Sequence, residues 1–122
     1  MPRTNAASSA TKEADDPRLV ERVREALAGI PKVTERRMFG GTGFMIRGHL
    51  CLSARPARIM CRIDPATHDE AIEREGCSTM TMKGREYRGY VRVDASAVRT
   101  KRELKYWVDR ALKFSRTLPA KK

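Results

Sequence analysis

Apolar residues recur every three or four positions between residues 19 and 30, which is the spacing of one face of an α-helix. Asp16 and Pro17 stand before this stretch as an N-cap and a first helical residue. Gly29 and Pro31 follow it, and both residue types are typical of the end of a helix. The pattern therefore predicts an amphipathic helix that starts at Asp16 and is closed by Gly29 and Pro31.

Between residues 33 and 93 most apolar positions alternate with polar ones, and this period of two is typical of strands buried on one face. Turns interrupt the alternation at Arg47-Gly48 and around Pro56. The strands predicted from this pattern cover residues 33–39, 43–46, 49–53, 58–63, 78–82 and 87–93.

Two further helices are predicted from caps and periodicity. An Asp-Pro pair at positions 64 and 65 repeats the start signal of the first helix and predicts a short helix over residues 65–75. Thr100 and Glu103 fit a capping box at the start of a last helix, which Pro119 ends. The buried face predicted for this last helix consists of Leu104, Trp107, Val108, Ala111, Leu112, Ser115 and Leu118.

The elements follow one another as helix, three or four strands, helix, two strands and helix. This order predicts an α+β protein with two layers, in which helices pack on an antiparallel sheet of about five strands. At 122 residues the chain is long enough for one domain, which we place at residues 16–119. We expect residues 1–15 to be a disordered tail and residues 120–122 a short basic tail.

The chain contains no apolar run near the ~18 residues that span a bilayer. Its N-terminal residues also lack the apolar centre of a secretory signal. We therefore expect no membrane contact and a cytoplasmic protein.

The clearest candidate for chemistry is the stretch RRMFGGTGFMIRGH at residues 36–49, in which glycines stand beside arginines. A phosphate-binding loop needs a helix directly after its glycines, whereas Phe44-Met45-Ile46 has the pattern of a strand. We therefore interpret the glycines as a bend or bulge between two strands, because only glycine reaches positive φ cheaply. The basic residues of this stretch are expected to join the charged surface as Arg36, Arg37 and Arg47.

Cysteine and histidine offer little for catalysis or metal binding. Cys51, Cys61 and Cys77 are an odd number without CxxC spacing, which indicates neither a disulfide framework nor a zinc site. If the turn around Pro56 is symmetric, Cys51 lies opposite Cys61 on the next strand, as a small core residue. No nucleophile motif accompanies the two histidines, so the sequence predicts no enzyme, no metal and no cofactor.

The net charge of +11 favours a polyanionic partner, either nucleic acid or an acidic protein. In the strands at 58–63 and 87–93, the alternation puts basic residues on one face of the sheet. That face carries Arg58, Arg62, Arg88, Tyr90 and Arg92. It has three open interpretations: a nucleic-acid platform with an aromatic for base stacking, a dimer face, or a solvated surface. The last helix adds the basic residues Arg102, Lys105, Lys113 and Arg116.

Four stretches in their order resemble the N-terminal domain of TfoX/Sxy proteins: LVERVREALAGIPKVTERRMFGGTGFMIRGHL, the helix after IDP, YRGYVRVD and WVDRALKFSRTLP. The most specific element is the motif Met38-Phe39-Gly40-Gly41. The resemblance covers residues 17–119 and implies a two-layer domain with an antiparallel sheet. It also implies a regulatory role, because full-length members promote transcription of competence genes together with a cyclic-AMP receptor protein. It implies no catalytic residues.

These observations lead to two hypotheses of function. The first is a small non-enzymatic regulator or adaptor that acts through a protein partner, such as the transcription machinery, with a homodimer as one arrangement. The alternative is a direct nucleic-acid-binding module that uses the basic sheet face and the basic last helix.

Overall fold

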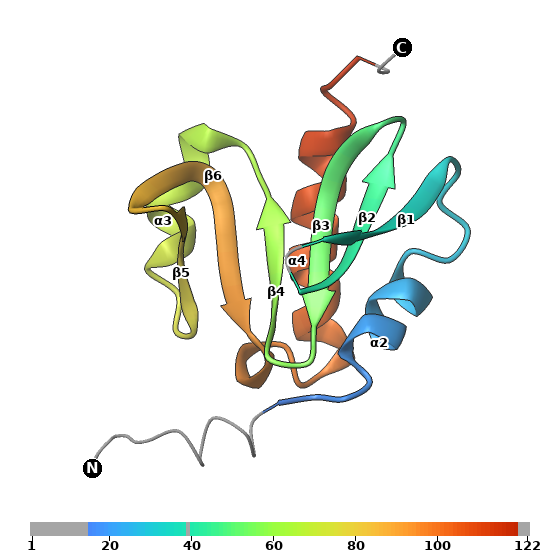
Figure 1. The fold of residues 1–122 in the computed structure, drawn as a ribbon, viewed down its shortest axis with the longest axis horizontal. Helices are drawn as coiled ribbons and strands as arrows, with labels where there is room; N and C mark the ends of the chain where they lie inside the picture. Colours follow the sequence, from blue (N-terminus) through green and yellow to red (C-terminus); the bar gives the residue numbers. More distant parts are fainter. Residues whose placement is uncertain (1–14, 39, 120–122) are drawn as a thin grey trace.

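The computed structural model describes residues 15–38 and 40–119, which form a layer of helices on one face of a twisted antiparallel sheet (Figure 1). The sheet has six strands in the order β1-β2-β3-β4-β6-β5. The strands are β1 (Val33–Met38), β2 (Gly41–Ile46), β3 (His49–Arg55), β4 (Arg58–Arg62), β5 (Cys77–Met82) and β6 (Arg85–Asp94). The helices are α2 (Leu19–Ala26), α3 (His68–Ile72) and α4 (Lys101–Ser115), with short 3-10 turns η1 (Pro65–Thr67) and η2 (Ala95–Ala97).

The predicted α+β class and the predicted order of elements are confirmed. The sheet has six strands where about five were expected, because the fourth strand, left optional in the prediction, is present. The tails predicted for residues 1–15 and 120–122 lie outside the described residues, apart from Asp15. None of the helices in the described stretches has the length and apolar content required to cross a bilayer.

Tight turns join the strands where the sequence places glycine. Arg47 and Gly48 have φ values of 51° and 87°, and Lys83 and Gly84 have values of 53° and 78°. A pair of positive φ values matches the right-handed twist of the flanking strands, so these two turns are favoured hairpin connections. The predicted turn at Arg47-Gly48 is thus confirmed.

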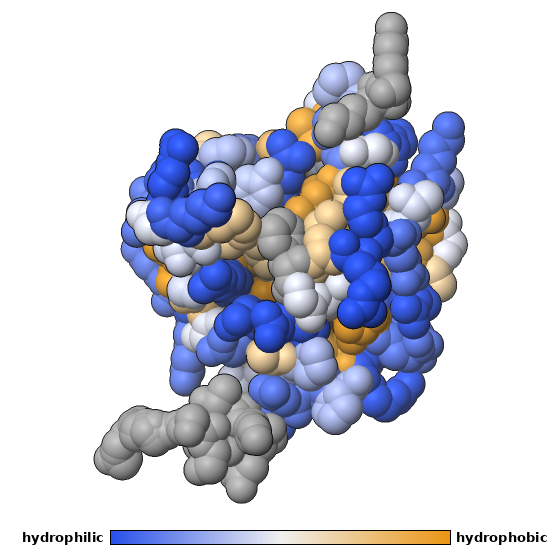
Figure 2. All heavy atoms as spheres, viewed as in Figure 1, coloured by the Kyte–Doolittle hydropathy of each residue, from blue (hydrophilic) through white to orange (hydrophobic). Residues whose placement is uncertain are grey.

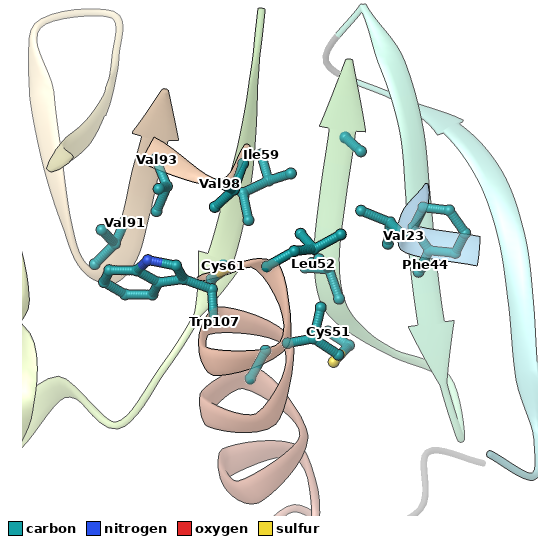
Figure 3. Packing of buried hydrophobic residues seen from close by; sticks show 14 of the residues in the cluster. Val23, Phe44, Cys51, Leu52, Ile59, Cys61, Val91, Val93, Val98 and Trp107 are labelled. Carbon is teal, nitrogen blue, oxygen red and sulfur yellow. The ribbon is translucent and has the colours of Figure 1, made fainter. Parts of the chain in front are cut away.

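The hydrophobic core lies between the sheet and α4 (Figure 3). Trp107 of α4 points toward Val91 of β6, and Val23 of α2 lies beside Phe44 of β2. The predicted buried face of α4 is confirmed from Leu104 to Ser115. The capping box is also present, since the Thr100 hydroxyl accepts from the Glu103 amide and the Glu103 carboxylate accepts from the Thr100 amide.

The first two helices are shorter than predicted. Asp16 does not cap α2, because its carboxylate accepts a hydrogen bond from the Arg18 amide and closes a turn that precedes the helix. The helix also ends at Ala26, before Gly29. The segment predicted as one helix over residues 65–75 is divided into η1 and the five-residue α3.

α4 ends at Ser115, before the predicted stop at Pro119. Arg47 Nη2 donates hydrogen bonds to the carbonyls of Ser115 at 2.9 Å and Leu118 at 3.2 Å. The last carbonyls of a helix lack helical partners, so this guanidinium caps the end of α4. Arg47 therefore has a structural role and does not merely join the charged surface.

The predicted register between Cys51 and Cys61 is wrong by one position, because Leu52 lies opposite Cys61. The ladder of β2 and β3 shifts between Phe44 and Met45, and it skips Cys51. A bulge of this kind lets two consecutive side chains point the same way, and both Cys51 and Leu52 are buried. The expectation that both cysteines lie in the core is confirmed.

Candidate functional site

The face of the sheet opposite the helices, seen in Figure 2, carries hydrophilic and hydrophobic residues side by side. A small groove on this face is lined by arginine and methionine. Arg55 lies opposite Arg58 across β3 and β4, and Met60 lies opposite Arg92 across β4 and β6. Residues paired in this way point to the same side of a sheet, so the three arginines converge. The groove has a volume of about 120 Å³ and is lined chiefly by Arg55, Arg58, Arg92, Met38, Met60, Met80 and Met82. We call it the arginine–methionine groove.

Gly41 of the sequence motif lines this groove, and two neighbouring glycines lie against side chains that line it. Gly40 has a φ of 72°, and a Cβ built on it would stand 3.3 Å from Nη1 of Arg55. A Cβ built on Gly43 would stand 2.5 Å from the sulfur of Met38. The expected bend is therefore present at Gly40, whereas Gly43 has no positive φ and instead makes room for a side chain. Phe39, the remaining motif residue named above, lies outside the described residues.

The groove carries positive charge that the described residues do not neutralise by ion pairing. No carboxylate in the described part of the chain lies within ion-pair distance of Arg55, Arg58 or Arg92. Burial, and then the charges of Arg92 and Arg55, lower the pKa of Arg58, while Asp94, its cross-strand neighbour, and Asp15 act in the opposite direction. An anion in the groove would relieve this repulsion.

The structure separates the five residues predicted for the basic sheet face. Arg58 and Arg92 line the groove, and Arg92 is oriented by a 3.1 Å hydrogen bond to the Thr81 carbonyl. Arg62 lies between two rings, with its guanidinium carbon 5.6 Å from the centroid of Tyr90 and 5.5 Å from that of Phe114. Tyr90 is therefore occupied by an arginine of its own chain.

Arg88 is the fifth predicted residue of that face, and it is engaged in an ion pair. Its guanidinium donates two hydrogen bonds to Asp69 of α3, at 2.8 and 3.2 Å. Both side chains are more than half exposed, so the pair contributes little to stability. Arg88 does not line the arginine–methionine groove.

The basic residues predicted on α4 belong to the helical layer, so they do not extend the basic sheet face. Arg102 lines a hollow beside Arg74 and Tyr106. Lys113 lines another hollow, with Phe114. The remaining two, Lys105 and Arg116, line a larger groove between α2 and α4.

This larger groove, which we call the helix groove, has a volume of about 680 Å³. Its apolar lining consists of Ala26, Ile30, Leu104, Val108 and Leu112. Its basic lining consists of Arg18, Arg22, Arg99, Lys101, Lys105 and Arg116. The two acidic residues that line it are already paired, Glu25 with Arg18 at 3.6 Å and Asp109 with Lys105 at 2.6 Å.

Arg55 is the functional candidate that the sequence interpretation missed. It lies at the end of β3, beyond the predicted strand at 49–53. The signal was present in the sequence, because Arg55 and Arg58 flank the two-residue turn at Pro56-Ala57 and must face each other if the strands continue to it.

Neither the thiols nor His68 have the environment of a catalytic group. Burial raises the pKa of Cys51 to about 12 and that of Cys77 to about 11, and it raises the pKa of Cys61 further. His68 is buried, where its Nδ1 accepts from the Gly89 amide at 2.9 Å and its Nε2 lies 2.8 Å from the Thr79 hydroxyl. Within residues 15–38 and 40–119, no three His, Cys, Asp or Glu side chains gather as a metal site.

Comparison with protein families adds the decisive observation. The model of the TfoX N-terminal domain family matches residues 25–115 of this chain. The chain belongs to the TfoX N-terminal domain family. The match confirms the resemblance seen in the sequence, and it lies within the domain expected at residues 16–119. TfoX N-terminal domains are not a known enzyme family, so the match assigns no reaction. Searches of curated proteins and of solved structures gave no match.

Proposed function

We propose that this TfoX N-terminal domain is a small non-enzymatic regulatory module that binds a protein partner and acts in transcriptional regulation of the competence type. The observation that carries the proposal is the helix groove, the largest of the described hollows, whose lining combines five apolar residues with basic ones. The membership of the chain in the TfoX N-terminal domain family supports the regulatory role.

The lining of the helix groove favours an amphipathic helix as the part of the partner that binds. Leu104, Val108 and Leu112 follow one another at four-residue spacing along α4 and form the floor of the groove, with only 3%, 1% and 6% of their surface exposed. The apolar surface that a partner can reach therefore comes mainly from Ala26, which is exposed, and Ile30, which is half-buried. A helix with apolar residues at matching spacing can place them in such a groove.

The rim of the helix groove favours an acidic helix. Arg99, Lys101 and Arg116 are exposed and have no carboxylate within ion-pair distance among the described residues. Charges at the rim of an interface steer the partner and select against partners of like charge. Acidic residues flanking the apolar row of the partner would satisfy these three basic side chains.

Site-specific photocrosslinking in the cells that produce the protein tests this proposal. A photoreactive residue replaces Lys101 at the groove or, as a matched control, Lys83 on the turn after β5. We expect a protein adduct from position 101 that is absent from position 83. The double variant Lys101→Glu, Arg116→Glu should lose the association by at least about tenfold if rim charges contribute as at other interfaces. Equal adducts from both positions, or adducts with nucleic acid alone, would overturn the proposal.

A further inference from the structure

We infer that the arginine–methionine groove binds a small molecule through its terminal phosphomonoester group. This ligand site lies on the sheet face, apart from the helix groove, and does not depend on the protein partner proposed above. Three guanidinium groups meet there, and each can donate paired hydrogen bonds to phosphate oxygens.

The charge of the groove selects a phosphomonoester over other anions. A phosphomonoester carries about −1.5 to −2 charges at neutral pH, whereas a carboxylate or a phosphodiester carries about −1. Arg55, Arg58 and Arg92 have no carboxylate within ion-pair distance among the described residues. Arg58 is partly buried, and electrostatic attraction is stronger where water is partly excluded. A phosphomonoester, with its higher charge, therefore binds more favourably there than a carboxylate or a phosphodiester.

The size of the groove excludes a large ligand from its interior. A volume of about 120 Å³ can hold one tetrahedral phosphate but cannot enclose a whole nucleotide, so the rest of a larger ligand would lie outside the groove. A phosphodiester has chain on both sides of its phosphorus and presents two unesterified oxygens to the recess, whereas a terminal phosphate presents three. A terminal phosphate on a small molecule can enter from the solvent side.

One arginine of the groove is oriented before any ligand binds. Arg92 donates a hydrogen bond to the Thr81 carbonyl, whereas the guanidinium of Arg55 occupies the space that the absent side chain of Gly40 leaves open. Pre-positioned donors lose less entropy on binding than free ones.

The walls of the groove suggest what the ligand carries beside its phosphate. Met38, Met80 and Met82 lie at the edge of the recess, and methionine side chains pack adaptably against flat apolar groups. The body of the ligand is therefore expected to be small and partly apolar. Phenyl phosphate has this chemistry and serves as the probe.

Methyl NMR of the wild-type chain with labelled methionine tests the site without any substitution. Phenyl phosphate should shift the methyl signals of Met38, Met60, Met80 and Met82 at the groove. The signal of Met45, which does not line the groove, should stay in place. Inorganic phosphate tests the phosphate alone, diphenyl phosphate tests the monoanionic diester, and a single-stranded oligonucleotide tests the nucleic-acid backbone. Sodium chloride at equal ionic strength is the reference.

Isothermal titration calorimetry with arginine variants then tests which arginines bind the phosphate. Arg58→Gln and Arg92→Gln should each weaken phenyl phosphate binding by about tenfold or more, as expected for loss of charged hydrogen bonds. Arg88 lies on β6, like Arg92, but outside the groove. Arg88→Gln should therefore leave phenyl phosphate binding unchanged. Circular dichroism confirms that each variant is folded.

Three outcomes would overturn the inference. The first is the absence of methyl shifts with up to about 10 mM phenyl phosphate relative to chloride, a range that covers the weak binding of a single small anion. The second is equal loss of binding in Arg88→Gln and Arg58→Gln. The third is tighter binding of the oligonucleotide or of diphenyl phosphate than of phenyl phosphate, which would assign the groove to phosphodiesters.

Discussion

The guanidinium group of Arg55 lies against Gly40, and a Cβ on that glycine would stand only 3.3 Å from Nη1 of the arginine. The contact joins the turn before β2 to the end of β3. Two parts of the sequence that seemed unrelated, the glycine cluster and the turn at Pro56, therefore meet at one recess. The glycines form no phosphate loop of their own, but they make room for an arginine at the site where we propose that a phosphate binds.

Gly41→Ala is expected to destabilise the protein more than Gly84→Ala does. A Cβ on Gly41 would collide with the carbonyl oxygen of Ala54 on the neighbouring strand, so the strands must separate, at a cost of about 3 kcal/mol. Gly84 has a φ of 78° and open space around it, so alanine there costs about 1–2 kcal/mol through its backbone alone. Urea unfolding measures both, and equal losses would contradict the predicted collision.

Arg22→Lys is expected to destabilise the protein by about 1–3 kcal/mol, because the half-buried guanidinium joins several partners. It donates to Asp16 at 2.7 Å and to the Val98 carbonyl at 2.9 Å, linking α2 to the segment before α4. A single ammonium cannot reach both. Arg24→Lys on the same helix is the control, since its ion pairs are exposed and should cost less than about 0.5 kcal/mol. Thermal unfolding measures both variants, and an equal loss of stability in Arg22→Lys and Arg24→Lys would refute the prediction.

His68 is expected to make stability depend on pH below about 6.5. Burial, and then the charge of Arg88, lower the pKa of His68 beneath its usual value of 6.5. Protonation of Nδ1 would also break the hydrogen bond that this nitrogen accepts from the Gly89 amide. The unfolded chain therefore takes up a proton first, and stability falls as pH drops from about 6.5 through the lower folded pKa.

Urea midpoints between pH 7.5 and 5 measure this dependence. His68→Gln should flatten the slope in that window and should lower stability at pH 7.5 by about 1–3 kcal/mol, since it disturbs two buried hydrogen bonds. A wild-type slope in His68→Gln would show that another group titrates.

The native protein is expected to expose one reactive thiol. Cys77 is half-buried with a pKa near 11, whereas Cys51 and Cys61 are about 1% exposed or less. Titration with a disulfide reagent at about pH 8 should therefore modify Cys77 slowly and the other two only after unfolding. Cys77→Ser should abolish the slow modification that is seen before unfolding. Rapid modification of two thiols in the folded chain would contradict the burial of the core cysteines.

Local patterns in the sequence predicted those features that depend on neighbouring residues. The capping box at Thr100 and the buried face of α4 were correct because a helix repeats its faces every few residues. The hairpin at Arg47-Gly48 was correct because its glycine tolerates the positive φ that the turn requires. Membership in the TfoX N-terminal domain family was likewise recognisable from the order of short motifs.

Features that depend on strand register could not be predicted from these patterns. The bulge at Cys51 shifts the pairing of β2 with β3 by one position, and periodicity alone does not reveal such a bulge. The cap that Arg47 places on α4 joins residues 68 positions apart, which no local pattern encodes.

The candidate sites show the same division. The sequence by itself determined the α+β class, the alternation that puts Arg58 and Arg92 on one sheet face, and the excess of positive charge. Only the tertiary structure decided that these arginines line one groove, that Arg62 is held between Tyr90 and Phe114, and that the basic residues of α4 lie in the other layer. The physical reason is that periodicity states which face a side chain takes, whereas register and sheet twist decide which side chains meet there.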